Sequence, residues 1–425
     1  MPLIGEQGST PDQVGGGFSP GHVMPGGKLS AFRTLDQVDV KGKRVLVRVD
    51  LNVPMNNGDV SDSTRIAASA KTINEIADKG GRVILLSHFG RPKGRNPADS
   101  LKRIATAAAR IIGRPVAFAD DCVGEAAERA VNAMKAGDVL CLENTRFHPG
   151  EEKNDAGFIA KLARLADIWV NDAFSVAHRA HASSAGMAQA LPAFAGRSMQ
   201  AELDALVKAL EHPARPVAAV VGGAKVSSKL DLLGNLLAKV DVLIIGGAMA
   251  NTFLAALGKK TGKSLVEPDL VATAREIMDK AKAADREIVL PVDAVVAERL
   301  EAHVPSRVVD VDHVGEGDMM LDIGPRSIEH AVSVLARVKT LVWNGPFGAF
   351  EHEPFDNGTI EVAEAAAELT QAGKLVSVAG GGDTVAALNA AGVTDRFTYV
   401  STAGGAFLEW LEGKALPGVE ALRVK

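Results

Sequence analysis

Short apolar runs alternate with longer amphipathic stretches along most of this chain. Four runs in the first half, rich in β-branched residues, predict strands: Arg44–Asp50, Arg82–Ser87, Asp138–Glu143 and Asp167–Asn171. The stretches between them have apolar positions at helical spacing and predict helices: Thr64–Lys79, Ser100–Ile112, Cys122–Ala136 and Asp155–Leu165. Such alternation is typical of βαβ units and predicts a parallel sheet.

The second half repeats this pattern. Its predicted strands are Pro216–Val221, Asp241–Ile245, Ile288–Val292, Thr340–Trp343 and Lys374–Val378, and its predicted helices include Ser227–Lys239 and Pro268–Ala284. Between the halves, Leu191–Gly196 fits neither pattern, and a helix-like stretch, Met199–Leu210, follows it. We therefore predict an α/β fold with two Rossmann-like parallel-sheet lobes joined by a hinge helix, and an active site in the interlobe cleft.

The predicted domain organisation follows from these patterns. Residues 1–29 are rich in Gly and Pro, lack apolar periodicity and are expected to form a disordered tail. We expect a first lobe over 30–198, a hinge helix over 199–212 and a second lobe over 213–413. A chain of 425 residues is longer than a single hydrophobic core usually serves, which also favours two domains.

Composition narrows the class of protein. The chain is 47% hydrophobic and 23% charged, as in ordinary globular proteins, and its net charge of -5 argues against non-specific binding to nucleic acid or membranes. No apolar run reaches the roughly 20 residues that span a bilayer. The two cysteines, Cys122 and Cys141, lie in apolar or helical settings without a disulfide framework. These observations predict a cytoplasmic protein, and no exposed apolar stripe calls for a partner subunit, so we expect a monomer.

Cationic and polar residues gather where the first-half strands end. The candidates are Asp50, Asn52, Arg65, His88, Arg91, Arg146 and Arg179, with His178 and His181 nearby. Arginine binds phosphate or carboxylate through a planar fork of donors, and Asp50 and Asn52 add partners for a hydroxyl group. The set predicts a small ligand with phosphate, carboxylate and hydroxyl groups. Two plainer readings stay open: Arg65 could pair with Asp62, and Arg179 could be an exposed loop cation.

Glycine clusters follow the second-half strands instead. Gly222–Lys225 leads into a helix at Val226–Lys229, which resembles a phosphate cradle, and the four-residue spacing of Lys225 and Lys229 places them on one helix face. The other clusters are Gly246-Gly247-Ala248, Gly380-Gly381-Gly382-Asp383-Thr384 and Ala403-Gly404-Gly405. These glycines would allow a nucleotide to approach the backbone closely.

Two acidic residues near these glycines, Asp383 and Glu351, have two readings each. Asp383 could hold Mg²⁺, which usually takes one or two carboxylates plus substrate phosphates, or could be an ordinary helix N-cap. Asn344 lies in a turn after a strand, and Glu351 follows on the same loop, where it could contact ribose hydroxyls or be solvated.

Two further segments are decoys, because they resemble nucleotide-binding motifs without matching them. Gly258–Ser264 is one residue short of a Walker A motif and is read as a basic surface loop, and Gly315–Gly317 lacks the third glycine of a dinucleotide fingerprint.

From about Phe32 to its C-terminus, the chain resembles the phosphoglycerate kinase family. The matching motifs are Val47–Pro54, Ser87–Pro92, Leu142–Phe147, Asn171–Phe174, Ala177–Arg179, Gly222–Val226, Trp343–Pro346 and Gly380–Thr384. The resemblance implies that the first lobe binds 3-phosphoglycerate or 1,3-bisphosphoglycerate. Asp50 and Asn52 would meet its hydroxyl and carboxyl end, and Arg65 would lie beside the phosphoryl group in transit. The phosphate would be held by His88, Arg91, Arg146 and Arg179.

For the second lobe, the resemblance implies an ATP/ADP site with Mg²⁺ on Asp383. Its expected nucleotide contacts are Lys225, Lys229, Gly247, Asn344, Glu351, Gly380, Gly381, Gly382, Asp383 and Thr384. The C-terminal segment 414–425 would pack back on the first lobe. The implied reaction transfers a phosphoryl group between 1,3-bisphosphoglycerate and ADP by in-line transfer after hinge closure, with Arg65 and Lys225 as the catalytic residues.

The chain departs from the family pattern in four places: Ala248, Ala403, Phe407 and the pair Ser175-Val176. An added methyl at Ala248 or Ala403 could crowd the nucleotide or tilt its base. None of these departures is expected to touch a charge-handling residue, so we expect altered affinity rather than lost chemistry. Three other functions remain open on the residues alone. They are a sugar-nucleotide glycosyltransferase, a non-catalytic scaffold protein and a nicotinamide dehydrogenase, the last of which lacks its fingerprint.

Overall fold

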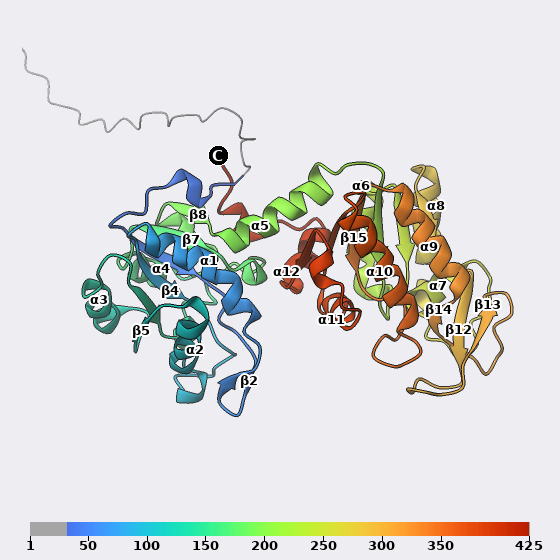
Figure 1. The fold of residues 1–425 in the computed structure, drawn as a ribbon, viewed down its shortest axis with the longest axis horizontal. Coiled ribbons are helices and arrows are strands. Elements are labelled where there is room, and N and C mark those ends of the chain that lie inside the picture. Colours follow the sequence, from blue (N-terminus) through green and yellow to red (C-terminus); the bar gives the residue numbers. More distant parts are fainter. Residues whose placement is uncertain (1–31, 425) are drawn as a thin grey trace, which may run out of the picture. The chain divides into compact units, whose positions relative to one another are not determined.

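Residues 32–424 are described in the computed structural model, so the tail predicted over residues 1–29 lies outside the described residues. The described chain contains two six-stranded parallel sheets, each covered by helices (Figure 1). We call the residues around the first sheet the first lobe and those around the second sheet the second lobe. Strands β1 and β9, at the centres of the two sheets, are buried over nearly their whole length because helices cover both faces. The α/β fold class predicted from the sequence is confirmed.

The first sheet has the order β5-β6-β4-β1-β7-β8. Its strands are β1 (Arg44–Arg48), β4 (Arg82–Leu86), β5 (Val116–Ala119), β6 (Val139–Leu142), β7 (Ile168–Asn171) and β8 (Ala193–Ala195). The interpretation of Leu191–Gly196 as an interruption was wrong, because β8 pairs in parallel with β7 at the sheet edge. Strand β5 was also missed. Both strands are too short to show a clear alternation.

Helices pack on both faces of the first sheet. They are α1 (Thr64–Asp78), α2 (Lys102–Ile112), α3 (Gly124–Asn132) and α4 (Ala156–Ala163). Alternate residues of β1 point to opposite faces: Val45 and Val47 join a core with α1 and α2, whereas Leu46 joins the core that includes α3 and α4. A two-stranded hairpin, β2 (Met55–Asn56) with β3 (Asp59–Val60), follows β1.

The second sheet has the order β11-β10-β9-β15-β16-β17. Its strands are β9 (Val217–Val221), β10 (Val242–Ile245), β11 (Glu287–Val289), β15 (Thr340–Asn344), β16 (Val376–Gly380) and β17 (Tyr399–Ser401). Its helices are α6 (Leu230–Lys239), α7 (Met249–Ala256), α8 (Val271–Ala283), α9 (Pro325–Arg337), α10 (Asn357–Gln371), α11 (Gly382–Ala390) and α12 (Gly405–Leu411). Helices α9 and α10 lie side by side over one face (Figure 1).

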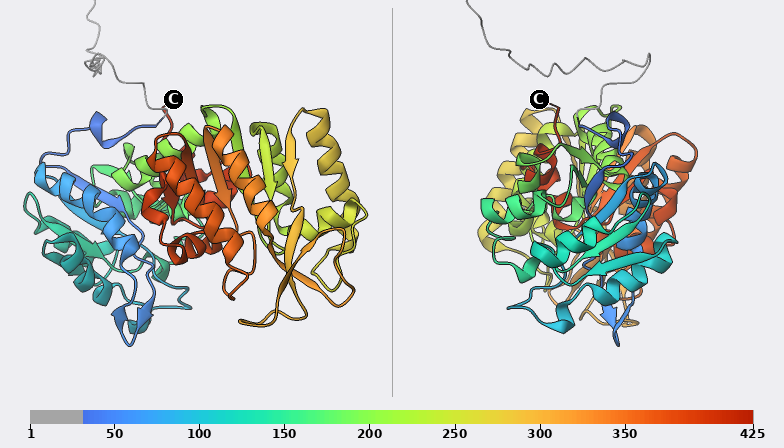
Figure 2. Two further views of the ribbon diagram at one scale, coloured as in Figure 1. Left: turned by 45° about the vertical axis from the view of Figure 1, so that its right-hand side comes forward. Right: turned by 90° about the vertical axis from the view of Figure 1, so that its left-hand side faces the viewer.

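A small antiparallel sheet, which the sequence patterns did not predict, belongs to the second lobe. Its order is β13-β12-β14, with β12 (Asp293–Ala297), β13 (Arg307–Asp310) and β14 (Met319–Ile323), drawn in yellow and orange in Figure 2. It has a separate small core around Val296 and Met320. The decoy segment Gly258–Ser264 is a loop that contacts this sheet, since Lys263 N–H donates to the Asp318 carbonyl at 2.7 Å.

Helix α5 (Arg197–Leu206) follows the last strand of the first sheet and continues as a π-helix over Val207–Glu211 before β9 begins. The first residue of α5, Arg197, forms ion pairs with Glu75 on α1 at 2.6 Å and with Asp36 at 2.7 Å. These ion pairs attach the start of α5 to the first lobe.

The C-terminal residues return to the first lobe. Helix α13 (Pro417–Glu420) follows α12, and Gly418 N–H donates to the carbonyl of Ala177 at 2.8 Å. The side-chain amide of Asn171 donates to the Gly418 carbonyl at 3.2 Å, and Phe32 forms a β-bridge with Arg423. Both ends of the described chain therefore lie against the first sheet.

Short 3-10 helices account for several boundary differences. They are Leu35–Gln37, Pro97–Asp99, Thr145–Phe147, Phe174–Val176, Gly186–Gln189, Ser227–Lys229, Pro268–Leu270 and Thr394–Arg396. The helices predicted over Ser227–Lys239 and Pro268–Ala284 each begin with such a turn. The helix predicted over Cys122–Ala136 is shorter than expected and spans Gly124–Asn132.

Candidate functional site

The first cluster of predicted site residues lies at the carboxyl end of the first sheet. Strand β1 is central, with β4 on one side and β7 on the other, so the order of the strands reverses around β1. Loops that leave neighbouring strands at such a reversal diverge and leave room for a ligand. Asp50 and Asn52 follow β1, His88 follows β4, and Arg179 lies in the segment after β7.

Asp50, Asn52 and Arg65 form one connected group. Arg65 NH1 lies 3.2 Å from Asp50 Oδ2 and donates to the backbone carbonyl of Asn52 at 2.8 Å. Asn52 Oδ1 in turn accepts from the backbone N–H of Gly90 at 2.9 Å. The alternative partner of Arg65, Asp62, instead accepts from Thr64 at 2.8 Å. Arg65 is thus oriented toward the strand ends, with 39% of its side chain exposed.

His88, Arg91, Arg146 and Arg179 form a cationic cluster beside this group. The pKa of the buried His88 is well below its usual value, because of burial first and then of the positive charges of Arg48, Arg146 and Arg179. Burial also lowers the pKa of Arg146, and Arg179 and Arg91 lower it further. Arg146 NH1 donates to the Gly90 carbonyl at 2.5 Å, and its Nε lies 3.1 Å from Glu152. An anion at this position would relieve the repulsion between the cations.

Three buried residues beneath this cluster were missed by the sequence reasoning. Arg48, Glu151 and Ser183 are each at most 2% exposed, and they connect to His88 by hydrogen bonds. Arg48 lies inside Val47–Pro54, one of the motifs that match the family pattern. It was not assigned a role, although it is a charged residue within an apolar strand. The sequence does carry one signal, because Arg48 stands inside an apolar run, where an arginine is rarely found unless it is paired.

The second cluster lies at the carboxyl end of the second sheet. Strand β9 is central, and the order reverses between β9 and β15. Here the backbones approach so closely that only glycine fits: a Cβ on Gly222 would lie 1.9 Å from the Pro346 carbonyl oxygen. A Cβ on Gly247, whose φ is +66°, would lie 2.5 Å from the Gly223 nitrogen. The glycine-rich sequences thus build a surface of exposed backbone groups.

Lys229, Asn344, Gly380 and Thr384 are brought together at this edge. The Lys229 ammonium donates to Asn344 Oδ1, and the Asn344 amide donates to the Gly380 carbonyl at 2.8 Å. Thr384 Oγ1 accepts from the backbone N–H of Gly345 at 2.7 Å. Burial lowers the pKa of Lys229 to about 8, while the nearby Asp383 carboxylate opposes this shift.

The expected helix face shared by Lys225 and Lys229 was wrong. Lys225 lies in the loop before the 3-10 turn Ser227–Lys229 and is exposed, so the spacing rule for helices does not apply to it. Lys229 is half-buried and already hydrogen-bonded to Asn344. The exposed Lys225 therefore has more freedom to reach a ligand than Lys229 has.

Asp383 and Glu351 line a cavity of about 300 Å³ that also includes Gly223, Gly247 and Ala248. The N-cap reading of Asp383 was wrong, because Gly381 is the N-cap of α11 and Gly382 its first residue. Asp383 is exposed in the first turn, and within residues 32–424 its carboxylate forms no ion pair. Mg²⁺ prefers oxygen donors, and an accessible carboxylate beside glycine loops that could hold phosphate groups provides such a donor. Glu351 is likewise exposed.

The departures from the family pattern contact site residues after all. Ser175 Oγ donates to Asp50 Oδ2 at 2.5 Å, and a Cβ on Gly380 would lie 2.7 Å from the ring of the buried Phe407. Ala403 lines a different cavity, of about 200 Å³, that includes Asp50 and Arg65. Only Ala248 faces the cavity of Asp383. The expectation that the departures avoid charge-handling residues was therefore wrong, whereas the effect of Ala403 on the nucleotide stays a prediction.

The cavity that Ala403 lines also contains two buried carboxyl groups. Glu202, on α5, accepts from the hydroxyl of Tyr399, on β17, at 2.6 Å. Asp172, after β7, accepts from the backbone N–H groups of Ser198 and Met199 at the start of α5, at 2.9 and 3.1 Å. Burial raises the pKa of each carboxyl to about 7. Helix α5 is thus hydrogen-bonded both to the end of β7 and to β17.

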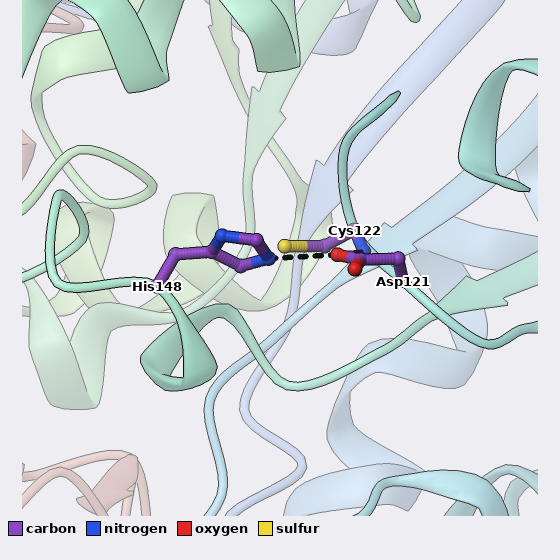
Figure 3. Close-up of side chains that lie close together, drawn as sticks. All are labelled: Asp121, Cys122 and His148. Carbon is purple, nitrogen blue, oxygen red and sulfur yellow. Dashed lines mark hydrogen bonds and ion pairs between the residues drawn. The ribbon is translucent and has the colours of Figure 1, made fainter. Parts of the chain in front are cut away.

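Asp121, Cys122 and His148 form a separate cluster in the first lobe, with their ligand-type atoms within 4.8 Å of one another (Figure 3). Asp121 Oδ1 lies 2.7 Å from His148 Nε2, and Asp121 Oδ2 lies 2.9 Å from Arg95. The Cys122 thiol is buried and its pKa is raised well above the usual value, mainly by burial. The carboxylate of Asp121 thus has both His148 and Arg95 as partners, and the thiol beside it lies in the core of the first lobe. Cys122 and Cys141 are both free and buried.

Two α/β lobes, one with a cationic cluster at its sheet edge and one with a glycine-lined sheet edge, are the arrangement of a two-lobed transferase. A family model described as phosphoglycerate kinase matches residues 35–414. The chain belongs to the phosphoglycerate kinase family. It is a phosphotransferase with a carboxyl group as acceptor, and its glycolytic reaction converts 1,3-bisphosphoglycerate and ADP reversibly to 3-phosphoglycerate and ATP.

Individual relatives agree with this assignment. The phosphoglycerate kinase of Rhodopseudomonas palustris is 65% identical over 394 residues, which cover 93% of this chain and 99% of the relative. That of Xanthobacter autotrophicus is 65% identical over 395 residues, covering 93% and 100%. The solved phosphoglycerate kinase of Coxiella burnetii has a TM-score of 0.86 at 41% identity and covers 92% of this chain and 98% of its own. None of the helices within residues 32–424 combines the length and apolar character that a bilayer crossing requires.

Proposed function

We propose that the first-lobe cluster binds the phosphoglycerate, that the second-lobe cluster binds the nucleotide, and that the phosphoryl group passes directly between them after the lobes close. The observation that supports this assignment is the contrast between the two sheet edges. The first presents cationic side chains around Arg146, whereas the second presents backbone groups around Gly222 and Gly247. Cationic forks suit a phosphate and a carboxylate, and close backbone approach suits a polyphosphate chain.

The chemistry requires alignment and charge stabilisation more than proton transfer. In the direction of acyl-phosphate synthesis, the attacking group is a carboxylate, which is ionised at neutral pH and needs no general base. We assign Arg65 and Lys225 to the phosphoryl group in transit. Arg65 is partly exposed beside Asp50 at the end of the first sheet, and Lys225 is exposed in the loop that follows Gly222 and Gly223. Closure would exclude water and align the attacking and leaving oxygens.

Within the substrate site, we assign Asp50 and Asn52 to the hydroxyl and carboxyl end of the phosphoglycerate. His88, Arg91, Arg146 and Arg179 would hold its phosphate. The hydrogen bonds of Asp50, Asn52 and Arg65 support this division, because these residues form a connected group of their own beside the cluster of the three other arginines and His88.

For the nucleotide, we assign Lys229, Asn344, Gly380–Gly382 and Thr384 to the phosphate side and Glu351 to the ribose. Asp383 would hold Mg²⁺, which when bound neutralises phosphate charge and fixes the position of the phosphate oxygens. Its fit rests on the exposed carboxylate in the cavity shared with Gly223 and Gly247. We also propose that the protein is a cytoplasmic monomer, with a first lobe that ends at residue 198 and a second lobe that begins at residue 213.

ATP formation from ADP and 1,3-bisphosphoglycerate, with and without Mg²⁺, tests the assignment most directly. We expect turnover that depends on Mg²⁺, and an Asp383→Asn variant that needs a higher Mg²⁺ concentration. In Arg65→Ala, kcat should fall about 10³-fold while the Kd of ADP stays unchanged, because the arginine would act on the charge in transit. The matched control is Arg103→Ala, an exposed arginine on α2. Equal loss of kcat and of ADP affinity in Arg65→Ala would remove it from the catalytic step.

A further inference from the structure

We propose that Arg48, held by Ser183 and Glu151, is a positioning residue that fixes His88 as the neutral tautomer with its proton on Nε2. His88 would then offer an N–H donor, rather than a lone pair, to the anionic substrate. This inference rests on the proposed function only in naming phosphoglycerate as the anion. The tautomer itself follows from contacts within the protein.

The contacts form one buried chain. The Glu151 carboxylate accepts from Ser183 twice, from Oγ at 2.5 Å and from the backbone N–H at 3.1 Å. Ser183 Oγ accepts from Arg48 Nε at 2.9 Å, and Arg48 NH2 lies 2.8 Å from His88 Nδ1. The four side chains are buried, with exposures from 0% to 4%. A buried, hydrogen-bonded chain of this kind holds each member in a single rotamer.

The chemistry of the guanidinium decides the tautomer. An arginine side chain only donates hydrogen bonds, since it has no acceptor and stays protonated. The His88 Nδ1 atom that contacts Arg48 must therefore accept, and the proton of a neutral His88 must be on Nε2. Within residues 32–424, Nε2 of His88 has no hydrogen-bond partner, so this N–H is available for a ligand.

The surrounding charges also keep His88 neutral. Arg48, Arg146 and Arg179 are the main cations near His88, and His181 adds a smaller effect of the same sign. The carboxylates of Glu151 and Asp50 act on Arg48, and Glu152 pairs with Arg146. A second proton on His88 would have to sit on Nδ1, directly against the Arg48 guanidinium. His88 therefore adds a donor to the cationic cluster without adding to its charge.

Arg48 thus has a different task from the other arginines of the cluster. Ser183, Ser87 and the Val49 carbonyl accept its other hydrogen bonds, which leaves little of the guanidinium for a substrate. If the chain were broken, His88 could adopt the opposite tautomer and turn a lone pair toward the anion. Losing one charge-assisted hydrogen bond in this way corresponds to a loss of substrate affinity of about 10- to 100-fold.

Nitrogen-15 NMR of histidine-labelled, ligand-free protein tests the tautomer without reference to any substrate, with His88→Asn used to assign the signals. We expect His88 to show a protonated Nε2 and an unprotonated Nδ1 that do not titrate between about pH 6 and pH 9. A proton on Nδ1, or titration of His88 in this range, would overturn the proposal. Because no substrate is present, this measurement stands even if the proposed function is wrong.

Kinetics with 3-phosphoglycerate and ATP then test the consequence. Ser183→Ala should raise the KM for 3-phosphoglycerate about 10-fold and leave the KM for ATP unchanged, with mixed-tautomer signals for His88. Ser333→Ala, which removes an exposed hydroxyl on α9 that donates to the His330 carbonyl, is the matched control and should leave both KM values unchanged. In addition, His88→Gln, whose amide can reach the Nε2 position, should retain more activity than His88→Asn.

These measurements distinguish a failure of the positioning role from a failure of the substrate assignment. An unchanged KM for 3-phosphoglycerate in Ser183→Ala, or equal activities of His88→Gln and His88→Asn, would refute the positioning role of the chain. If wild-type protein failed to bind 3-phosphoglycerate at all while the NMR signals were as expected, the substrate assignment would be wrong and the tautomer would stand. Ser183→Ala is preferred to Arg48→Met because removing the buried cation would leave Glu151 uncompensated.

Discussion

The buried carboxyl group of Glu202 should make the stability of this protein fall as the pH rises. Glu202 lies on α5, is 4% exposed and accepts a hydrogen bond from Tyr399 at 2.6 Å. Burial raises its pKa from 4.5 to about 7, against the opposing effects of Ser401 and Tyr399. A raised pKa means that the folded protein holds the proton more tightly than the unfolded chain does. The favourable contribution of Glu202 to the stability of the folded protein is therefore complete below about pH 4.5 and is lost as the pH rises through about 7.

The size of the effect follows from the difference between the two pKa values. A difference of about 2.5 pH units corresponds to about 3 kcal/mol in the free energy of unfolding between acidic and alkaline pH. Glu202→Gln replaces the carboxyl group by a neutral amide of the same shape, which can still accept from Tyr399. We expect the free energy of unfolding of Glu202→Gln to equal that of the wild type near pH 5. Near pH 9, it should exceed the wild-type value by up to about 3 kcal/mol.

Urea unfolding at a series of pH values, followed by circular dichroism, measures this difference. Glu298→Gln is the matched control because Glu298 is exposed, and its stability relative to the wild type should not vary with pH. A constant difference between Glu202→Gln and the wild type from pH 5 to pH 9 would show that the buried carboxyl group is not protonated in the folded protein. The reasoning about its burial would then be refuted.

Three further changes test other parts of the structure. Lys225→Ala should lower kcat about 10²- to 10³-fold with little change in the Kd of ADP, and near-normal turnover would exclude Lys225 from catalysis. Gly247→Ala would place a Cβ 2.5 Å from the Gly223 nitrogen, so we expect a Tm several degrees lower and weaker ADP binding, both measurable by thermal shift with and without ADP. Glu75, whose pKa is lowered to about 2 mainly by its hydrogen bond to Arg197, stabilises the fold above about pH 4.5 and loses this effect toward pH 2. Glu75→Gln should therefore cost about 2 kcal/mol at pH 7 and progressively less in acid, and a cost that does not change with pH would contradict the ion pair.

The sequence patterns predicted the main strands of both sheets because those strands are buried on both faces. A fully buried strand such as Val217–Val221 is a continuous apolar run bounded by polar or glycine residues, which is visible without any tertiary information. The edge strand Ala193–Ala195 and the small sheet of β12, β13 and β14 escaped notice. The three residues of the edge strand are too few to show a pattern of their own, and only their parallel pairing with β7 in the folded sheet identifies them as a strand.

The candidate site was likewise predictable from the sequence only in part. Glycine loops and clustered arginines are local signals, so Gly247 and Arg146 could be identified as candidates from the sequence. The partners of those residues could not. The pairing of Arg65 with Asp50, and not with Asp62, depends on the tertiary contact between the loop after β1 and α1. The bond of Lys229 to Asn344 joins segments more than a hundred residues apart, and Lys225 is exposed because it precedes the short 3-10 turn that carries Lys229.

The amino-acid sequence by itself determined the alternation of strands and helices, the class of fold and the types of residue at the strand ends, because these follow from local periodicity and side-chain chemistry. Only the tertiary structure decided which of those residues touch. It set the protonation of buried groups such as His88 and Glu202, because burial and the charges of distant segments govern the energy of placing a proton. It also showed that Ser175 and Phe407 reach site residues, which no spacing along the chain could indicate.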